Sequence, residues 1–120
     1  MDLINLKRYI MALEGIINYE ELQRVMVIDY NPKIPFNNSC SICEHTLVSN
    51  DVLSPQTTPI VIPGFGAMYR LIGDGIHTPT FSGFKKNSGS GNFDATSGRL
   101  NLITFIYDGV DYWYSINQAV

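Results

Sequence analysis

Apolar residues recur at a helical spacing near the start of the chain. They stand three, four, three and four residues apart, at Leu3, Leu6, Ile10, Leu13 and Ile17. This is the a/d spacing of a coiled-coil seam, although it covers only about two heptads. We therefore predict an amphipathic helix within an N-terminal helical segment, residues 1–24. Two interpretations stay open: the helix packs on its own domain, or its seam is an oligomer interface that joins two or three chains.

A change of pattern follows this segment. Residues 25–30 are mostly apolar and predict a strand that ends at Asn31-Pro32, because proline cannot donate to a strand ladder. Residues 32–58 are interrupted by proline, asparagine and serine. This composition predicts a loop-rich stretch with one short strand around residues 46–48.

Alternation of residue types dominates the second half of the chain. Prolines frame a short apolar run at residues 59–63, which predicts an edge strand or an extended arm, and residues 67–72 predict a strand. Residues 102–107 and 110–116 flank Asp108-Gly109, a signal for a type I′ hairpin. Both faces of this hairpin carry bulky residues, so we expect one face in the core and the other against a neighbouring chain.

These patterns together predict an α+β, mainly β protein. The N-terminal helical segment, residues 1–24, precedes a β-rich domain, residues 25–120, which we expect to fold as a small antiparallel β-sandwich or sheet. Its best-defined β part is residues 59–117. A chain of 120 residues is long enough for one domain with its own core.

Composition narrows the classes of partner. Charged residues make up only 16% of the chain, so we expect much of the surface to be uncharged or buried against another molecule. The formal charge is −3 and no run of Lys and Arg exceeds two residues, which argues against nucleic-acid binding. No apolar run spans a bilayer and no signal-peptide pattern is visible, so we predict folding in a cytoplasm without membrane insertion.

One cluster has the residue types of a metal site. Cys40, Cys43 and His45 lie in the string Cys-Ser-Ile-Cys-Glu-His, and a C-x-x-C pair on a tight turn can hold zinc, with His77 as a fourth ligand. Structural zinc sites usually show a second ligand pair, which is missing here. We therefore favour ordinary reduced, partly buried thiols and predict no metal and no cofactor.

Motifs of the common enzyme classes are also missing. The chain has no nucleophile elbow, no phosphate-binding loop and no H-E-x-x-H motif. Asp74 and Asp108 adjoin glycine, and turn formation explains them better than acid–base catalysis. We predict that the protein is not an enzyme.

The second half resembles a known type of domain. The stretch from Gly73 to Phe84 (Gly-Asp-Gly-Ile-His-Thr-Pro-Thr-Phe-Ser-Gly-Phe) precedes a hairpin that ends Tyr112-Trp113-Tyr114. This order of pieces, over about residues 67–117, resembles a small C-terminal β-domain of bacteriophage tail-fibre and related virion proteins. The resemblance implies a non-enzymatic virion component, such as a fibre, spike, decoration or assembly subunit. It also implies a homo-oligomer, often a trimer, among other virion proteins.

A second function stays open, namely recognition of a host-surface glycan. Sugars stack on exposed aromatic rings, and the candidate ligand contacts are His77, Tyr107, Tyr112, Trp113 and Tyr114. The alternative for the aromatic residues is burial in the core or in a subunit interface. The alternative for His77 is a structural position with its ring bonded to the backbone. Burial distinguishes the two functions, because a Trp113 that faces solvent favours glycan binding.

Overall fold

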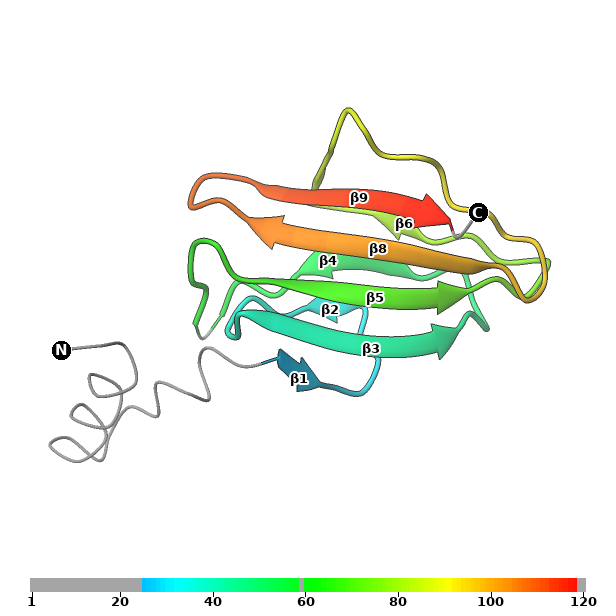
Figure 1. Ribbon diagram of the computed structural model, residues 1–120, viewed down its shortest axis with the longest axis horizontal. Coiled ribbons are helices and arrows are strands. Elements are labelled where there is room, and N and C mark those ends of the chain that lie inside the picture. The colour runs from blue at the N-terminus through cyan, green and yellow to red at the C-terminus, as the bar shows by residue number, and fades with distance from the viewer. Residues whose placement is uncertain (1–24, 59, 119–120) are drawn as a thin grey trace, which may run out of the picture.

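The computed structural model describes residues 25–58 and 60–118, which form nine strands in two stacked sheets (Figure 1). The strands are β1 (Val25–Val27), β2 (Lys33–Ile34), β3 (Cys40–Thr46), β4 (Val52–Pro55), β5 (Gly66–Ile72), β6 (Thr80–Phe81), β7 (Lys85–Lys86), β8 (Leu100–Tyr107) and β9 (Tyr112–Gln118). The larger sheet has six strands in the order β1-β3-β5-β8-β9-β7, and the smaller sheet has three in the order β2-β4-β6.

The chain alternates between the two sheets through its first six strands. Strands β1, β3 and β5 are parallel neighbours in the larger sheet, and β2, β4 and β6 are parallel neighbours in the smaller one. Parallel neighbours need a crossover connection, which is usually a helix. Here a strand of the opposite sheet makes each crossover. The result is a flattened coil of three turns, formed by β1-β2, β3-β4 and β5-β6.

An antiparallel hairpin completes the larger sheet. Strand β8 pairs antiparallel with both β5 and β9, and the short β7 pairs with the outer edge of β9. The hairpin was predicted correctly, but its turn was not. Four residues, 108–111, connect Tyr107 to Tyr112, where a two-residue turn was expected. Gly109 has a φ of +98°, a left-handed conformation that glycine adopts without strain.

The hydrophobic core lies between the two sheets and includes residues of both. Its buried members are Ile34, Phe36, Cys43, Leu47, Leu53, Ala67, Tyr69, Leu71, Ile103, Phe105 and Ile116. Tyr69 on β5 is 0% exposed, and its hydroxyl donates a 2.8 Å hydrogen bond to the carbonyl oxygen of Asn31. This bond satisfies the only polar group of the tyrosine side chain and ties the larger sheet to the segment that leads into β2.

A buried asparagine holds the long loop that precedes β8. Asn101 is 0% exposed, and its Oδ1 accepts hydrogen bonds from the Asp94 backbone N–H at 2.8 Å and from Gln118 Nε2 at 2.7 Å. Its Nδ2 donates to backbone carbonyl oxygens, including that of Asp94 at 2.9 Å. Both ends of the amide are therefore satisfied, as burial of a polar group requires.

The predicted α+β class is wrong. None of the described residues is helical, and the strands form mixed and parallel sheets, not an antiparallel sandwich. The coarser expectation of a small β-rich protein with two packed sheets is confirmed. The predicted helical segment, residues 1–24, lies outside the described residues, and with it the seam of Leu3, Leu6, Ile10, Leu13 and Ile17. No helix that could cross a membrane occurs in residues 25–58 and 60–118.

The prediction of a loop-rich stretch at residues 32–58 is also wrong, because this stretch contains β2, β3 and β4. Its prolines delimit strands instead of excluding them: Pro35 follows β2 directly, and Pro55 is the last residue of β4. Of the two alternatives for residues 59–63, an edge strand or an extended arm, the edge strand does not form in the described part, residues 60–63. There the Ile62 backbone N–H donates to the carbonyl oxygen of Phe36 at 3.1 Å.

Candidate functional site

The residues of the larger sheet that point away from the core form one continuous surface. Strand register aligns them in four rows across the sheet. The rows are Val25, Cys40, Gly66, Ile106, Trp113 and Lys85; Val27, Ile42, Met68, Thr104 and Ser115; Glu44, Arg70, Leu102 and Asn117; and Thr46, Ile72 and Leu100. We call these four rows the outer face.

The outer face is mostly apolar. A sheet with one face in water normally carries polar residues on that face. Here three apolar residues reach solvent with large exposed fractions: 86% for Val27, 55% for Val25 and 44% for Ile106. Two charged residues near the middle, Glu44 and Arg70, pair with each other at 3.1 Å. The outer face therefore has the character of a contact surface.

A hollow of about 150 Å³ interrupts the outer face at Gly66. A side chain cannot fill it from this position, because a Cβ on Gly66 would overlap the carbonyl oxygen of Phe105. Cys40, Met68, Thr104 and Ile106 are among the residues that line the hollow. The close approach of β5 and β8 thus creates a small, largely apolar depression.

Trp113 lies in the same row as this hollow, on the other side of Ile106. Its indole Nε1 donates to Asp108 Oδ2 at 2.9 Å, and the Lys85 ammonium is 5.8 Å from the ring centroid. Lys85 also pairs with Asp111 at 3.1 Å. The hydrogen bond from the backbone N–H of Asp111 is the largest cause that lowers the pKa of Asp108, and the hydrogen bond from the Trp113 indole is the next. Trp113 is thus a half-buried aromatic residue with Asp108 at its indole N–H and Lys85 over its ring.

The other three predicted aromatic contacts point inward. The Tyr114 ring stacks on Phe81 with 3.9 Å between centroids, and Tyr107 stacks on Tyr112 at 4.5 Å. All three tyrosines pack against the core. Burial raises the pKa of Tyr112 and Tyr114. Of the four aromatic residues, only Trp113 lies on the outer face.

The structure separates the four zinc candidates. Strand β3 places Cys40 on the outer face and Cys43 in the core, because residues three apart on a strand point to opposite sides. His45 stacks on Tyr30 with 3.8 Å between ring centroids, and His77 lies in the loop after β5. Among the described residues, no group of three or more Cys, His, Asp and Glu residues could hold a metal ion. Burial raises the pKa of Cys40, and it raises that of Cys43 to about 11.

His77 is held by a side chain and not by the backbone bond that the sequence led us to expect. Its Nδ1 contacts the carboxylate of Asp74. The same carboxylate accepts the backbone N–H groups of Ile76 at 2.9 Å and His77 at 2.8 Å. The hydrogen bonds from His77, backbone and ring, are the main reason that the pKa of Asp74 is lowered. Aspartate commonly stabilises turns in this way.

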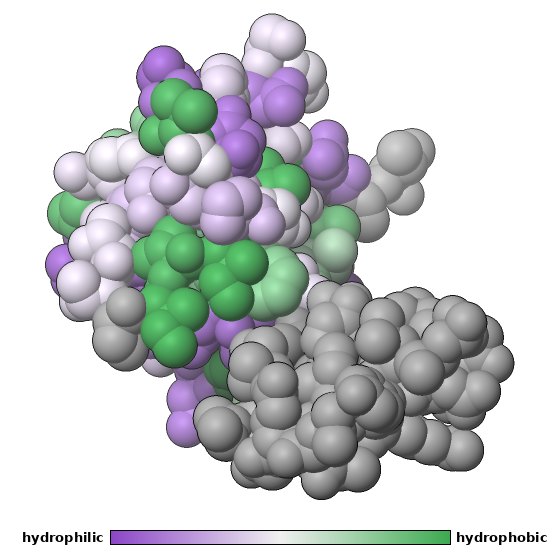
Figure 2. Space-filling view, turned by 90° about the vertical axis from the view of Figure 1, so that its left-hand side faces the viewer, coloured by the Kyte–Doolittle hydropathy of each residue, from purple (hydrophilic) through white to green (hydrophobic). Residues whose placement is uncertain are grey.

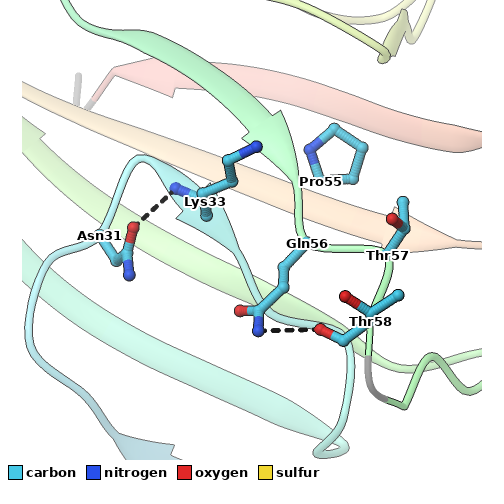
Figure 3. Close-up of a pocket in the computed structure, with 6 residues that line it drawn as sticks. All are labelled: Asn31, Lys33, Pro55, Gln56, Thr57 and Thr58. Carbon is cyan, nitrogen blue, oxygen red and sulfur yellow. Dashed lines mark hydrogen bonds between the residues drawn. The ribbon is translucent and has the colours of Figure 1, made fainter.

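The structure shows two surface features that the sequence analysis missed. The first is a polar hollow of about 300 Å³ beside the smaller sheet (Figure 3). It is lined by Asn31, Lys33, Pro55, Gln56, Thr57 and Thr58. The hydrogen bonds drawn there are local ones, from the Lys33 backbone N–H to Asn31 and from Gln56 to the Thr58 carbonyl oxygen, both 2.9 Å. The parallel pairing of β2 with β4 creates this hollow, and no local sequence signal predicts that pairing.

The second feature is an apolar patch at one end of the molecule. Figure 2 shows hydrophobic residues gathered there. Ile60 is 56% exposed and Val110 is 82% exposed. Their two loops touch, since the Gly64 backbone N–H donates to the carbonyl oxygen of Tyr107 at 2.7 Å. We call this surface, which includes Ile60, Pro63 and Val110, the end patch; the apolar residues of the two loops were its only sequence signal.

Searches against protein-family models, curated proteins and solved structures returned no significant match to this chain.

Proposed function

We propose that this protein is a non-enzymatic structural subunit that assembles with further copies of itself, and that it is a component of a bacteriophage particle. The apolar outer face of the larger sheet carries the assembly part of the proposal. Burial of apolar surface contributes about 25 cal/mol per Å². Contiguous apolar patches of several hundred Å² usually mark contact sites. The outer face fits this description.

The end patch supports the same conclusion. It lies at an end of the molecule, whereas the outer face lies along a broad side (Figures 1 and 2). Ile60 and Val110 are exposed, and a second molecule that approaches from this end would shield them from water. Two apolar surfaces that point in different directions allow one copy to contact more than one neighbour.

The phage part of the proposal rests on the sequence resemblance. The resembling residues, 67–117, span β5 to β9 and include four neighbouring strands of the larger sheet, β5-β8-β9-β7. The resemblance is therefore carried by one block in space and not by scattered pieces. It favours a trimer and an extracellular role on the particle, among other virion proteins.

The contacts of His77 support a non-enzymatic role. A His–Asp pair can serve catalysis when a hydroxyl or thiol contacts the second ring nitrogen. Among the described residues, the ring of His77 forms its hydrogen bond with the carboxylate of Asp74. The pair fixes the turn that follows β5, so its role is structural.

Measurement of the molar mass of the full chain by light scattering tests self-assembly. We expect a closed oligomer at micromolar concentration. A Leu102→Arg substitution should weaken it at least tenfold, because it places a charge at the centre of the outer face. The matched control is Thr58→Arg, which adds the same charge to an exposed position outside the outer face. A wild-type chain that stays monomeric at all concentrations would contradict the assembly proposal.

Mass spectrometry of purified phage particles tests the phage part. Peptides of this chain in the particle fraction, in a fixed ratio to the other virion proteins, would support it. Peptides found only in the particle-free fraction would exclude a virion component.

A second candidate function is binding of a host-surface glycan, which the position of Trp113 favours. An aromatic ring on the outer face beside Asp108 and Lys85 offers both a stacking surface and hydrogen-bonding groups. Trp113 is the only tryptophan of the chain, so its fluorescence reports on this site alone. A saturable fluorescence change on titration with host polysaccharide, lost in Lys85→Ala without a change in oligomer mass, would favour this function.

A further inference from the structure

We propose that the outer face pairs with the same face of a second copy about a two-fold axis, and that Trp113 of each copy occupies the Gly66 hollow of the other. This inference rests on the proposed function, because it names the contact through which self-assembly occurs.

The first argument is the arrangement of Trp113 and the hollow. Gly66 on β5 and Trp113 on β9 belong to one row, with Ile106 of β8 between them. Each is therefore about 4.8 Å to one side of β8. A two-fold axis that runs along β8 between two facing sheets exchanges these two positions. One rotation thus brings both tryptophans over both hollows, and the two copies of Ile106 meet on the axis.

The second argument is the size and chemistry of the hollow. Its volume of about 150 Å³ matches cavities that hold one aromatic ring, and it is smaller than pockets for larger ligands, which take roughly 300–1,000 Å³. Its lining includes Cys40, Met68 and Ile106, which offer apolar contacts. Tryptophan is enriched at the energetic centres of protein interfaces. The chain carries its one tryptophan on the same face as the hollow.

The third argument is charge. Two identical faces pair stably only if no charged side chain of one copy lies against the same charge of the other copy without an oppositely charged partner. The three charged side chains of the outer face already have partners within the same copy, Arg70 with Glu44 and Lys85 with Asp111, each at 3.1 Å. Pairing of two outer faces therefore brings together internally neutralised surfaces.

The fourth argument is area. An axis along β8 overlaps five strands, β3-β5-β8-β9-β7, and leaves β1 outside. Three central strands of at least seven residues, and the two-residue overlap of β7 with β3 on either side, give a footprint of roughly 400 Å² per copy, at a rise of about 3.3 Å per residue and a strand spacing of about 4.8 Å. This is below the area of a standard interface, so we expect a weak, reversible dimer. Aligned sheets pack with strand directions within about 30°, which such an axis permits.

Sedimentation equilibrium of the full chain is the first test. We expect a monomer–dimer equilibrium that Thr104→Arg and Trp113→Ala each weaken at least tenfold. Thr104 lines the hollow and is exposed on β8. Thr80→Arg is the matched control, because Thr80 is an exposed strand threonine of the smaller sheet. Circular dichroism and the unfolding midpoint of each variant verify that it is folded.

A crosslinking test does not depend on weakening the contact. The variant Ile106→Cys is made in a Cys40→Ser background and treated with a bismaleimide whose length matches the distance of about 10 Å between packed sheets. We expect the reagent to link two chains. Val27→Cys in the same background should not be linked, although Val27 is more exposed, because β1 lies outside the overlap.

The outcomes separate this inference from the proposed function. A wild-type chain that stays monomeric contradicts both. An oligomer that Thr104→Arg and Trp113→Ala leave intact, or a trimer without the link at position 106, overturns the two-fold contact and leaves self-assembly standing. A maleimide–ester crosslink within one chain from position 106 to Lys7 would place the N-terminal residues on the outer face, which also overturns it.

Discussion

Cys40 and Cys43 stand three residues apart on β3 and point to opposite sides of the six-stranded sheet. The side chain of Cys43 is 2% exposed in the core, whereas Cys40 lines the hollow at Gly66 on the outer face. A C-x-x-C pair binds a metal when a tight turn brings the two sulfur atoms together. An extended strand separates them, so the two thiols have different environments.

Alkylation should distinguish the two cysteines. Burial raises the pKa of both thiols, so both should react more slowly than a free thiol. We expect Cys40 to be labelled by N-ethylmaleimide at least tenfold faster than Cys43, as measured by peptide mass spectrometry. In denaturant the two rates should become equal. Equal rates in the native protein would contradict the placement of Cys43 in the core.

Removal of one buried hydroxyl should lower stability. Tyr69→Phe deletes the donor to the Asn31 carbonyl oxygen and keeps the packing of the ring. We expect the free energy of unfolding to fall by about 1–2 kcal/mol, as measured by urea denaturation. The control is Tyr107→Phe, whose hydroxyl donates to the Gly109 carbonyl oxygen at an exposed site and should change stability by less than about 0.5 kcal/mol.

Asn101 should be among the most sensitive polar positions. Asn101→Ala removes the buried amide and leaves the Asp94 backbone N–H and carbonyl without their partner. We expect a loss of about 2–4 kcal/mol, because several buried hydrogen bonds disappear together. Asn117→Ala, at an exposed position of the same hairpin, is the control and should be nearly neutral. Comparable losses in both variants would refute the role given to Asn101.

Acid should destabilise the protein through its hydrogen-bonded carboxylates. The hydrogen bonds from His77 lower the pKa of Asp74, and those from Ser49 and Tyr30 lower that of Asp51, from a reference value of 3.8. A carboxylate with a lowered pKa in the folded state stabilises the protein above its unfolded pKa, and this stability is lost as the pH falls. We expect the thermal unfolding midpoint to fall as the pH drops below about 4. In Asp74→Asn the midpoint should depend less steeply on pH. An identical pH profile in that variant would show that Asp74 does not contribute.

Alkali should destabilise the protein through its buried acids. Burial raises the pKa of Cys43 from 9.0 to about 11, and burial also raises the pKa of Tyr69. A thiol whose pKa is raised in the folded state keeps its proton to a higher pH there than in the unfolded chain. Its contribution is therefore complete below pH 9 and is lost as the pH rises to about 11. Cys43→Ala should flatten the stability profile between pH 9 and 11, whereas Cys40→Ala should change it less.

The sequence predicted those parts of the fold that have a local signal. The hairpin of β8 and β9 alternates regularly around Asp108-Gly109, so its two strands were predicted. The parallel pairing was missed because the partners are distant in sequence: Val25 pairs with Cys40, and Val52 with Thr80. The two residues of β2 and the two of β6 are too short to show any periodicity.

The candidate site was predictable only in part. Bulky residues on both faces of the hairpin indicated a second buried surface, and the outer face has that character. The hollow was not predictable, because it depends on the pairing of Gly66 with Ile106 between strands distant in sequence. The inward position of Tyr107, Tyr112 and Tyr114 follows from alternation, yet sequence alone does not show which side of the hairpin meets the smaller sheet.

The coil also determines when folding can begin during translation. Among the described strands, only β8 and β9 pair as consecutive neighbours; every other pairing skips at least one strand. Pairing between distant segments must first overcome the entropy of closing long loops. Among the described strands, a nascent chain that has emerged only as far as β7 contains no hairpin, so we expect most of the larger sheet to form after residues 100–118 have left the ribosome.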